Sequence, residues 1–197
     1  MTKADLRASA AALRADAHRE APDAGERLAK VTLAAVSFLE GAVVSAYWPI
    51  RSEIDPRPLM RFLVEAGCRV ALPLTPPPGV DAPLTFRLWN PEADLTPAAF
   101  DLHEPHAAST LVEPDIVLAP LLAFDRTGAR LGYGKGHYDR TLTALRSRRP
   151  LLAIGLAFAA QEVERVPTEH YDVPLDGIAT EIGYIPAMTR QASDQKA

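Results

Sequence analysis

The sequence is poor in cysteine and has no long run of apolar residues. Cys68 is the single cysteine among 197 residues, which excludes an internal disulfide framework and a metal site built from several thiolates. No apolar run approaches the length of a membrane span. The first twenty residues contain Asp5, Asp16 and Glu20, where a signal peptide would have an apolar core. We therefore expect a cytoplasmic protein with no membrane partner.

Positive charge is also in short supply. The chain has 25 Asp and Glu residues against 21 Lys and Arg, which gives a formal net charge of -4 and an isoelectric point of about 5.7. The molecule as a whole therefore does not attract nucleic acid or anionic membranes, and we expect no nucleic-acid partner. A small polyanionic ligand can still be bound by a few well-placed cations.

The length and the apolar content predict one domain. A chain of 197 residues with 48% hydrophobic residues can form one sizeable core, and it is short for two full domains. We predict a single domain over residues 1–188, acting as a monomer. The final segment "TRQASDQKA", residues 189–197, is polar and without periodicity, so we expect a flexible tail there.

Local patterns predict two helices followed by a βαβ unit. Apolar residues recur at helical spacing between residues 6 and 17, and in "PDAGER" the pair Asp23 and Glu26 predicts a capping box at the start of a second helix. The strand-like "AVVSAYW" comes next. In "DPRPLMRFLVEAG", Asp55 is suited to cap a helix, Pro56 to begin it and Gly67 to end it, and the strand-like "CRVALPL" follows.

The rest of the chain continues this alternation. We expect strands in "LTFRLW", "DIVLAP" and "LLAIGLAF", and a helix over residues 137–148. Strands that alternate with helices favour a three-layer α/β/α fold of Rossmann-like type, with a mostly parallel central sheet. In such folds ligands bind at the carboxyl ends of the strands.

The segment "RLGYGKGHYDR", residues 130–140, has the density of glycine that suggests a backbone approaching a ligand closely. It follows a strand and opens a helix, whose unpaired N–H groups bind anions, and Arg130 and Lys135 add positive charge. The spacing G-x-G-x-G matches neither the dinucleotide fingerprint nor the P-loop. On glycine content alone, a phosphate site is only slightly favoured over a structural turn.

The surrounding segment "DIVLAPLLAFDRTGARLGYGKGHYDRTL", residues 115–142, resembles the signature of the 5-formyltetrahydrofolate cyclo-ligase family, also called methenyltetrahydrofolate synthetases. The resemblance extends to Lys3 and Arg7, to "YWPIRSEID" around Glu53, and to "VPTEHYDVPLDGIATE". Two residues depart from the family pattern. Leu121 stands where the family usually has glycine, and His137 replaces the first tyrosine of a Tyr-Tyr-Asp-Arg motif.

The resemblance implies an ATP-dependent carbon-nitrogen cyclo-ligase on a sugar-phosphate isomerase/CoA transferase-like fold. The reaction converts 5-formyltetrahydrofolate to 5,10-methenyltetrahydrofolate, requires Mg²⁺ and releases ADP and phosphate through an N5-iminium phosphate. An N-formyl amide is a poor electrophile until its oxygen is phosphorylated. Such phosphoryl transfer depends mainly on positioning and electrostatic stabilisation, which cations, backbone amides and a metal provide.

The resemblance also assigns roles to individual residues. The catalytic residues it implies are Arg130, Lys135 and Tyr138. The ATP-binding residues it implies are Lys3, Arg7, Arg130, Leu131, Gly132, Tyr133, Gly134, Lys135, Gly136, His137 and Tyr138. The substrate-binding residues are Trp48, Glu53, Phe86, Trp89 and Tyr138. The Mg²⁺ ligands are Asp139 and Asp172, since magnesium requires hard oxygen donors.

Each assignment has a competing structural interpretation. Without the resemblance, Lys3 and Arg7 are typical solvated helix charges, and Glu53 is as well explained by a helix dipole as by a ligand. Trp48 and Phe86 lie in strand-like runs, where core positions are more common, so Trp89 is the better pocket candidate of the two tryptophans. The alternative functions are a non-catalytic relative that binds folate or nucleotide, and a sugar-phosphate enzyme on a similar fold. Retention of all the implied cations and carboxylates together favours the enzyme.

Overall fold

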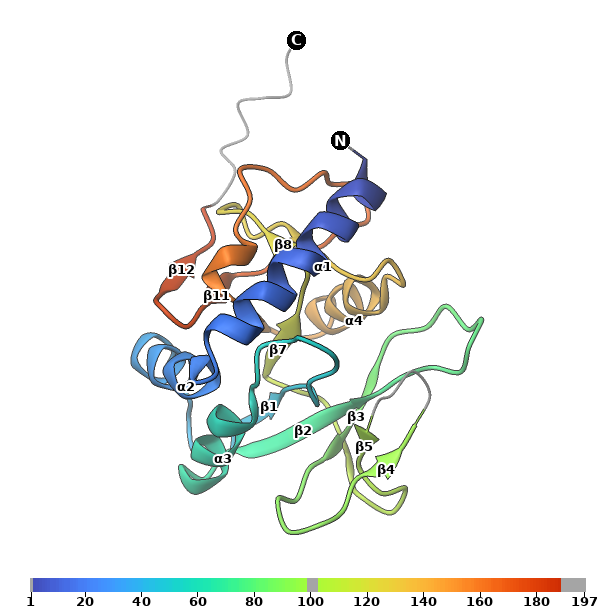
Figure 1. Ribbon diagram of the computed structural model, residues 1–197. Coiled ribbons are helices and arrows are strands. Elements are labelled where there is room, and N and C mark those ends of the chain that lie inside the picture. The colour runs from blue at the N-terminus through green and yellow to red at the C-terminus, as the bar shows by residue number, and fades with distance from the viewer. Residues whose placement is uncertain (1, 99–102, 189–197) are drawn as a thin grey trace.

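An eight-stranded sheet forms the centre of the computed structural model, which describes residues 2–98 and 103–188 (Figure 1). The strand order is β12-β11-β10-β7-β1-β2-β3-β6. The five inner strands pair in parallel and are β1 (Val43–Ser45), β2 (Arg69–Leu74), β7 (Ile116–Pro120), β10 (Leu152–Leu156) and β11 (Gly177–Ala179). Antiparallel strands extend both edges: β12 (Tyr184–Pro186) on one side, β3 (Thr85–Leu88) and β6 (Leu111–Val112) on the other.

Helices cover both faces of this sheet. Successive residues of a strand point to opposite faces, so Val44, Leu118 and Ile154 pack in one cluster with α2 (Ala24–Ala35) and α3 (Arg57–Glu65). Their neighbours Val117 and Ala153 pack in another cluster, with α4 (His137–Arg146). The predicted three-layer α/β/α fold with a mostly parallel sheet is therefore confirmed.

The N-terminal helix α1 (Lys3–Glu20) crosses the molecule in front of the sheet in Figure 1. Its buried residues Leu6 and Ala10 pack on a small hairpin of β8 (Ala123–Phe124) and β9 (Arg130–Leu131). Because β9 leads directly into the glycine segment, this packing sets α1 beside it. Leu13, at helical spacing with these residues, is instead 50% exposed, and Arg14 takes the next buried position.

The helix caps differ from the sequence expectation in two places. Asp23 precedes α2 but makes no side-chain cap, so the predicted capping box with Glu26 is not formed; Asp23 is paired with Arg27 at 3.3 Å instead. At α3, Pro56 lies at the cap position and Asp55 one residue before it, so the predicted assignment is shifted by one residue; the Asp55 carboxylate still accepts the N–H of Arg57 at 2.9 Å.

The remaining elements are short. Gly67, with φ +81°, follows the end of α3 as expected. A two-stranded sheet pairs β4 (Thr96–Pro97) with β5 (His103–Glu104), and the 3-10 turn η2 covers Ala159–Gln161. The predicted tail over residues 189–197 lies outside the described residues. Within the part of the chain that the structure describes, no helix combines the length and the apolar character needed to cross a bilayer.

Candidate active site

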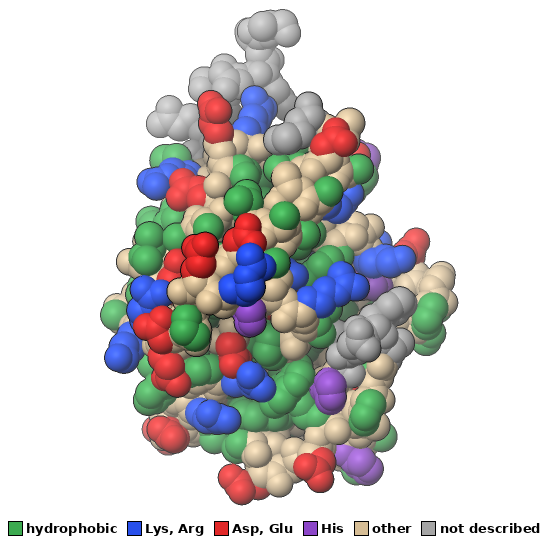
Figure 2. Space-filling view, viewed as in Figure 1, with side chains coloured by type: hydrophobic (Ala, Val, Ile, Leu, Met, Phe, Trp, Pro, Cys, Tyr) green, Lys and Arg blue, Asp and Glu red, His purple; other side chains and the backbone are tan. Residues whose placement is uncertain are grey.

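A cavity of about 1380 Å³ opens at the carboxyl ends of the parallel strands. Tyr47 and Trp48 reach it just after β1, Pro73 at the end of β2, and Pro120 at the end of β7. The glycine segment, the start of α1, the proline-rich connection and residues 169–173 complete its wall. Cavities for one small ligand usually measure about 300–1000 Å³, so this one has room for two. Lys, Arg and His side chains border an apolar area below α1 in Figure 2.

The backbone of the glycine segment takes conformations that favour glycine. Gly134 has φ +92° and Gly136, the residue before α4, has φ +64°. A Cβ built on Gly134 would lie 3.2 Å from Nη2 of Arg7, tighter than ordinary contact. The first turn of α4 lines the cavity beside these glycines. The segment thus combines a close-approach backbone with a helix N-terminus, an arrangement suited to an anion.

Two cations from α1 reach the same place, as the resemblance implies. The Nε of Arg7 donates to the carbonyl of Gly132 at 3.0 Å. The ammonium of Lys3 donates to Glu169 and Asp172, both at 2.7 Å. Partial burial opposes the charge of Lys3, but these two carboxylates outweigh it and raise its pKa. Both side chains are partly buried, have specific partners and line the cavity, unlike freely solvated helix charges.

Arg130 and Lys135 supply further positive charge. The Arg130 side chain is only 6% exposed, pairs with Asp139 at 2.8 Å, and lies with its guanidinium 5.6 Å from the ring centre of Tyr138. Burial, then the Glu53 carboxylate, raise the pKa of Tyr138 above its usual range, so its hydroxyl stays neutral. Lys135 is exposed at the cavity.

The two predicted metal ligands, Asp139 and Asp172, both line the cavity. Each carboxylate forms an ion pair within the protein: Asp139 with Arg130, and Asp172 with Lys3. Across residues 2–98 and 103–188, no three His, Cys, Asp or Glu side chains gather as a metal cluster. Mg²⁺ bound with a nucleotide usually takes one or two carboxylates, with phosphates and waters as its other ligands. Two oxygen donors beside a phosphate-type loop fit that requirement.

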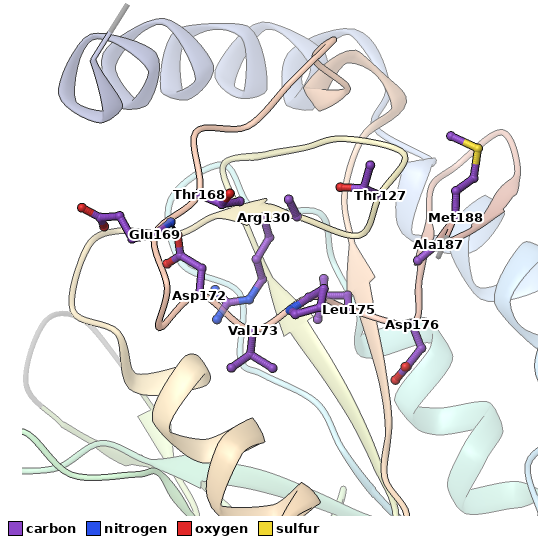
Figure 3. A pocket seen from close by; sticks show the side chains of 12 residues that line it. Thr127, Arg130, Thr168, Glu169, Asp172, Val173, Leu175, Asp176, Ala187 and Met188 are labelled. Atoms are coloured by element: carbon purple, nitrogen blue, oxygen red, sulfur yellow. Dashed lines mark hydrogen bonds between the residues drawn. The ribbon is translucent and has the colours of Figure 1, made fainter. Parts of the chain in front are cut away.

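A second cavity of about 370 Å³, shown in Figure 3, adjoins the first, and Arg130, Glu169, Asp172 and Val173 line both. In Figure 3 the Arg130 side chain lies between Asp172 and Val173, while Met188 is on the far side of the cavity. Arg130 and Asp172 thus form part of the partition between the two spaces.

The Glu53 carboxylate lies in a buried corner of the large cavity, 4% exposed. Oε2 accepts the N–H of Ile50 at 2.9 Å, and Oε1 accepts the hydroxyl of Tyr133 at 2.8 Å. Burial raises the pKa of Glu53, and these hydrogen bonds and Arg14 oppose that rise. The competing helix-dipole role is not supported, because the side chain bonds to Ile50 and Tyr133 and α3 begins only at Arg57.

The predicted aromatic wall is brought together only in part. Trp48 and Tyr138 line the cavity, whereas Trp89 and Phe86 do not. Trp89 packs beside Trp48 with ring centres 6.5 Å apart, so it supports that residue from the core. Phe86 is 3% exposed because its position in β3 directs it into the core cluster of α4. The prediction that Trp89 is the better pocket candidate of the two tryptophans is therefore wrong: Trp48 lines the cavity and Trp89 does not.

The two departures from the family pattern have local explanations. Leu121 is 2% exposed, and a Cβ on Gly155 would meet its side chain at 2.6 Å, so the leucine fits because residue 155 is glycine. His137 begins α4 and lines the cavity, and its Nδ1 lies 3.4 Å from the carbonyl of Ala82. The histidine therefore contacts the proline-rich connection.

Arg14 lies beside this site, against Tyr133 and Glu53, and the sequence did not single it out. It is 2% exposed, and its Nη1 donates to the Tyr133 hydroxyl at 2.6 Å. A signal was available in the sequence, because Arg14 continues the stripe of Leu6 and Ala10 at four-residue spacing. A charge on a buried stripe needs a partner, and that requirement points to a polar site beneath the helix.

A mostly parallel sheet with a glycine-rich loop and clustered cations at its carboxyl edge is typical of ligand-binding α/β proteins of the Rossmann-like class. Comparison with known proteins places the chain within that class. Residues 1–181 match the 5-formyltetrahydrofolate cyclo-ligase family, and the chain belongs to this family of enzymes.

Individual relatives agree. The chain is 36% identical to the 5-formyltetrahydrofolate cyclo-ligase of Escherichia coli K12 over 141 residues, 70% of this chain and 76% of the relative. It is 36% identical to that of Mycolicibacterium smegmatis over 72% of this chain and 75% of the relative. The structure of Aquifex aeolicus 5,10-methenyltetrahydrofolate synthetase has a TM-score of 0.76 at 26% identity, covering 100% of this chain and 97% of that one. The Mycoplasma pneumoniae synthetase, at 24% identity, shares the fold with a TM-score of 0.72 over 92% and 99% of the two chains.

Proposed function

We propose that this protein converts 5-formyltetrahydrofolate and ATP into 5,10-methenyltetrahydrofolate, ADP and phosphate. The observation that carries the proposal is that one cavity of about 1380 Å³ is lined by several cations, by a glycine-rich loop and by the Glu53 carboxylate. An enzyme that joins a polyphosphate to a pterin needs both halves in one space. The family membership supports the same reaction.

The polyphosphate half of the site is assigned to the glycine segment and four cations. The amides of residues 132–136 and the first turn of α4 contact the phosphates, and Lys3, Arg7, Arg130 and Lys135 offset their charge. Lys3 and Arg130 exchange their carboxylate partners for phosphate oxygens when nucleotide binds. That exchange releases Asp172 and Asp139, which would hold Mg²⁺. When bound, Mg²⁺ neutralises phosphate charge during transfer.

The pterin half is assigned to Glu53, Trp48 and Tyr138. A carboxylate accepts two N–H bonds from the amino and ring N–H groups of a pterin, and such charge-assisted pairs are strong. The flat ring of Trp48 and the phenol of Tyr138 provide apolar walls for the ring system.

The chemical steps need no protein nucleophile. The formyl oxygen attacks the γ-phosphorus, the bond to ADP breaks, and an N5-iminium phosphate results. The N10 amine then attacks the formyl carbon, loses its proton, and phosphate departs with the former formyl oxygen. Arg130 and Lys135 stabilise the charge on the transferring phosphoryl group, and the loop holds it in line with the formyl oxygen.

The test is the absorbance of methenyltetrahydrofolate formed from 5-formyltetrahydrofolate, with ATP and magnesium supplied together or singly. Product is expected only with both. A protein that binds 5-formyltetrahydrofolate tightly in calorimetry and forms no product with ATP and any divalent metal would be the non-catalytic relative, and the proposed reaction would be wrong.

A further inference from the structure

Arg14 is a buried charge in the middle of α1, away from the glycine segment in sequence. Its side chain is 3% exposed, and burying a charged group is costly unless other groups pair with it. Leu6 and Ala10, the preceding residues on the same stripe, serve the core. A leucine or alanine at position 14 would serve that packing without the cost. The arginine therefore calls for a role beyond packing.

The guanidinium of Arg14 joins three separate segments. Its Nη1 donates to the Tyr133 hydroxyl at 2.6 Å and lies 3.8 Å from Oε1 of Glu53. Its Nε donates to the hydroxyl of Ser52 at 3.2 Å. The centre of the guanidinium lies 5.5 Å from the ring centre of Tyr133. One side chain thus holds α1, the turn before α3 and the glycine segment together.

The Tyr133 hydroxyl relays this contact to Glu53. It accepts from Arg14 and donates to Oε1 of Glu53 at 2.8 Å, while the N–H of Ile50 donates to Oε2. Each carboxylate oxygen has two lone-pair sites, so one site on each remains for a bidentate ligand. The two protein donors fix the plane of the carboxylate, and Glu53 lines the cavity.

We propose that Arg14 is a positioning residue for the folate half of the site: through Tyr133 it orients the Glu53 carboxylate for the pterin N–H groups. This inference rests on the proposed function, which assigns the pterin to Glu53. It adds that the folate-binding geometry depends on a residue of α1, the helix whose N-terminal part carries Lys3 and Arg7, the cations assigned to the nucleotide.

The charges that surround Glu53 favour this role for Arg14. Two cations act on Glu53: Arg14 of α1, and the exposed Arg51 of the turn that contains Glu53. The other titratable groups that face it are phenols: Tyr47 after β1, Tyr133 in the glycine segment and Tyr138 in α4. Burial raises the pKa of Tyr133 to about 12, so it is neutral near pH 7. Arg14 is therefore the buried cation that offsets the burial of Glu53.

The experiment compares Arg14→Leu and Arg14→Lys with a matched control, Arg19→Leu. Arg19 lies on the same helix with a side chain 70% exposed, in a surface pair with Asp16. Affinity for 5-formyltetrahydrofolate is measured by calorimetry from pH 5 to 9, with the KM for ATP and a thermal unfolding curve for each variant. The assay uses the full chain.

Loss of Arg14 should weaken folate binding more than ATP binding. We expect affinity for 5-formyltetrahydrofolate to fall about tenfold or more in Arg14→Leu, with the KM for ATP changed far less. Without the cation the pKa of Glu53 rises further, so the carboxylate protonates at a higher pH. Folate binding is then lost at a higher pH as the solution is acidified. Arg14→Lys should restore part of the affinity, and Arg19→Leu should behave as the native chain.

Two further variants keep the inference testable if Arg14→Leu does not fold. Tyr133→Phe keeps the ring and removes the relay, and should also weaken folate binding. Native folate affinity and pH dependence in Arg14→Leu, or in Tyr133→Phe if the first is unfolded, would overturn the inference. Equal losses for folate and ATP would overturn it as well. Glu53→Gln separates the two proposals. If Glu53→Gln binds folate normally, the pterin assignment itself is wrong. If Glu53→Gln loses folate affinity while the Arg14 and Tyr133 variants keep it, only the role of Arg14 is refuted.

Discussion

At the scale of single residues, Glu53 is the group whose substitution tests the pterin assignment directly. Glu53→Gln exchanges a carboxylate that accepts two N–H bonds for an amide that presents a donor to one of them. Removing a charged hydrogen-bond partner costs about 1.5–3 kcal/mol, so folate affinity should fall by that amount with little change for ATP. Calorimetry with each ligand gives the comparison. Equal folate affinity in the variant would leave Glu53 with a structural role only.

Lys135 carries the second prediction at this scale. Lys135→Met roughly preserves the apolar stem and removes the charge, so turnover should drop by at least tenfold while the thermal unfolding curve stays unchanged. Lys30→Met is the matched control, because Lys30 is an exposed lysine on α2 that does not line the cavity. A native rate in Lys135→Met would show that this lysine does not act on the phosphates.

At the scale of elements, a substitution in the glycine segment tests the backbone conformation of the segment separately from its charge. Gly134→Val places a β-branched residue at φ +92° against Arg7, so nucleotide affinity should fall along with the rate. Gly41→Val is the control, since Gly41 has φ +80° with nothing within 4 Å of a built Cβ. Both variants should lose about 1–2 kcal/mol of stability from the left-handed backbone, and only the first should lose nucleotide. Normal ATP affinity in Gly134→Val would make the segment a simple turn.

The first turn of α4 carries the metal prediction. Asp139→Asn keeps the size of the side chain and removes an anionic oxygen, so its defect should be partly relieved at high magnesium if the residue holds the metal. Turnover is measured as magnesium is titrated with ATP fixed. The control is the variant Arg148→Met. Arg148 lies beyond the end of α4, does not line the cavity, and is paired with Glu113 at a distance of 2.8 Å. If added magnesium does not change the defect of Asp139→Asn, Asp139 does not hold the metal, and its role is limited to the ion pair with Arg130.

Local patterns predicted the elements well, and long-range partners escaped them. The βαβ unit, Gly67 and the start of α4 follow from cap residues and periodicity, which act over a few residues. The side to which Phe86 points depends on the register of β3 against β2, and no local pattern gives that register. The bond between Arg14 and Tyr133 joins residues 119 positions apart, so only the packing of α1 on the hairpin of β8 and β9 brings it about.

The same limit applies to the cations and carboxylates of the site. The sequence resemblance picked out Lys3, Arg130, Asp139 and Asp172 as ligand contacts, and they do lie at one cavity. It did not show that they are paired with one another before a ligand arrives. The pair of Lys3 and Asp172 joins residues 169 positions apart, and the pair of Arg130 and Asp139 joins β9 to α4, so both depend on how the edge of the sheet is assembled.

At the scale of the whole molecule, the volume of the cavity predicts that nucleotide and folate bind together. A ligand that binds only the folded state stabilises it by about 2.7 kcal/mol at a hundred times its dissociation constant. If the two ligands occupy separate halves of the 1380 Å³ cavity, their effects on thermal unfolding should add. The measurement uses 5-formyltetrahydrofolate and a non-hydrolysable MgATP analogue, singly and together. A combined shift no larger than the greater single shift would mean that the ligands compete for one space, and the two-ligand site would then be wrong.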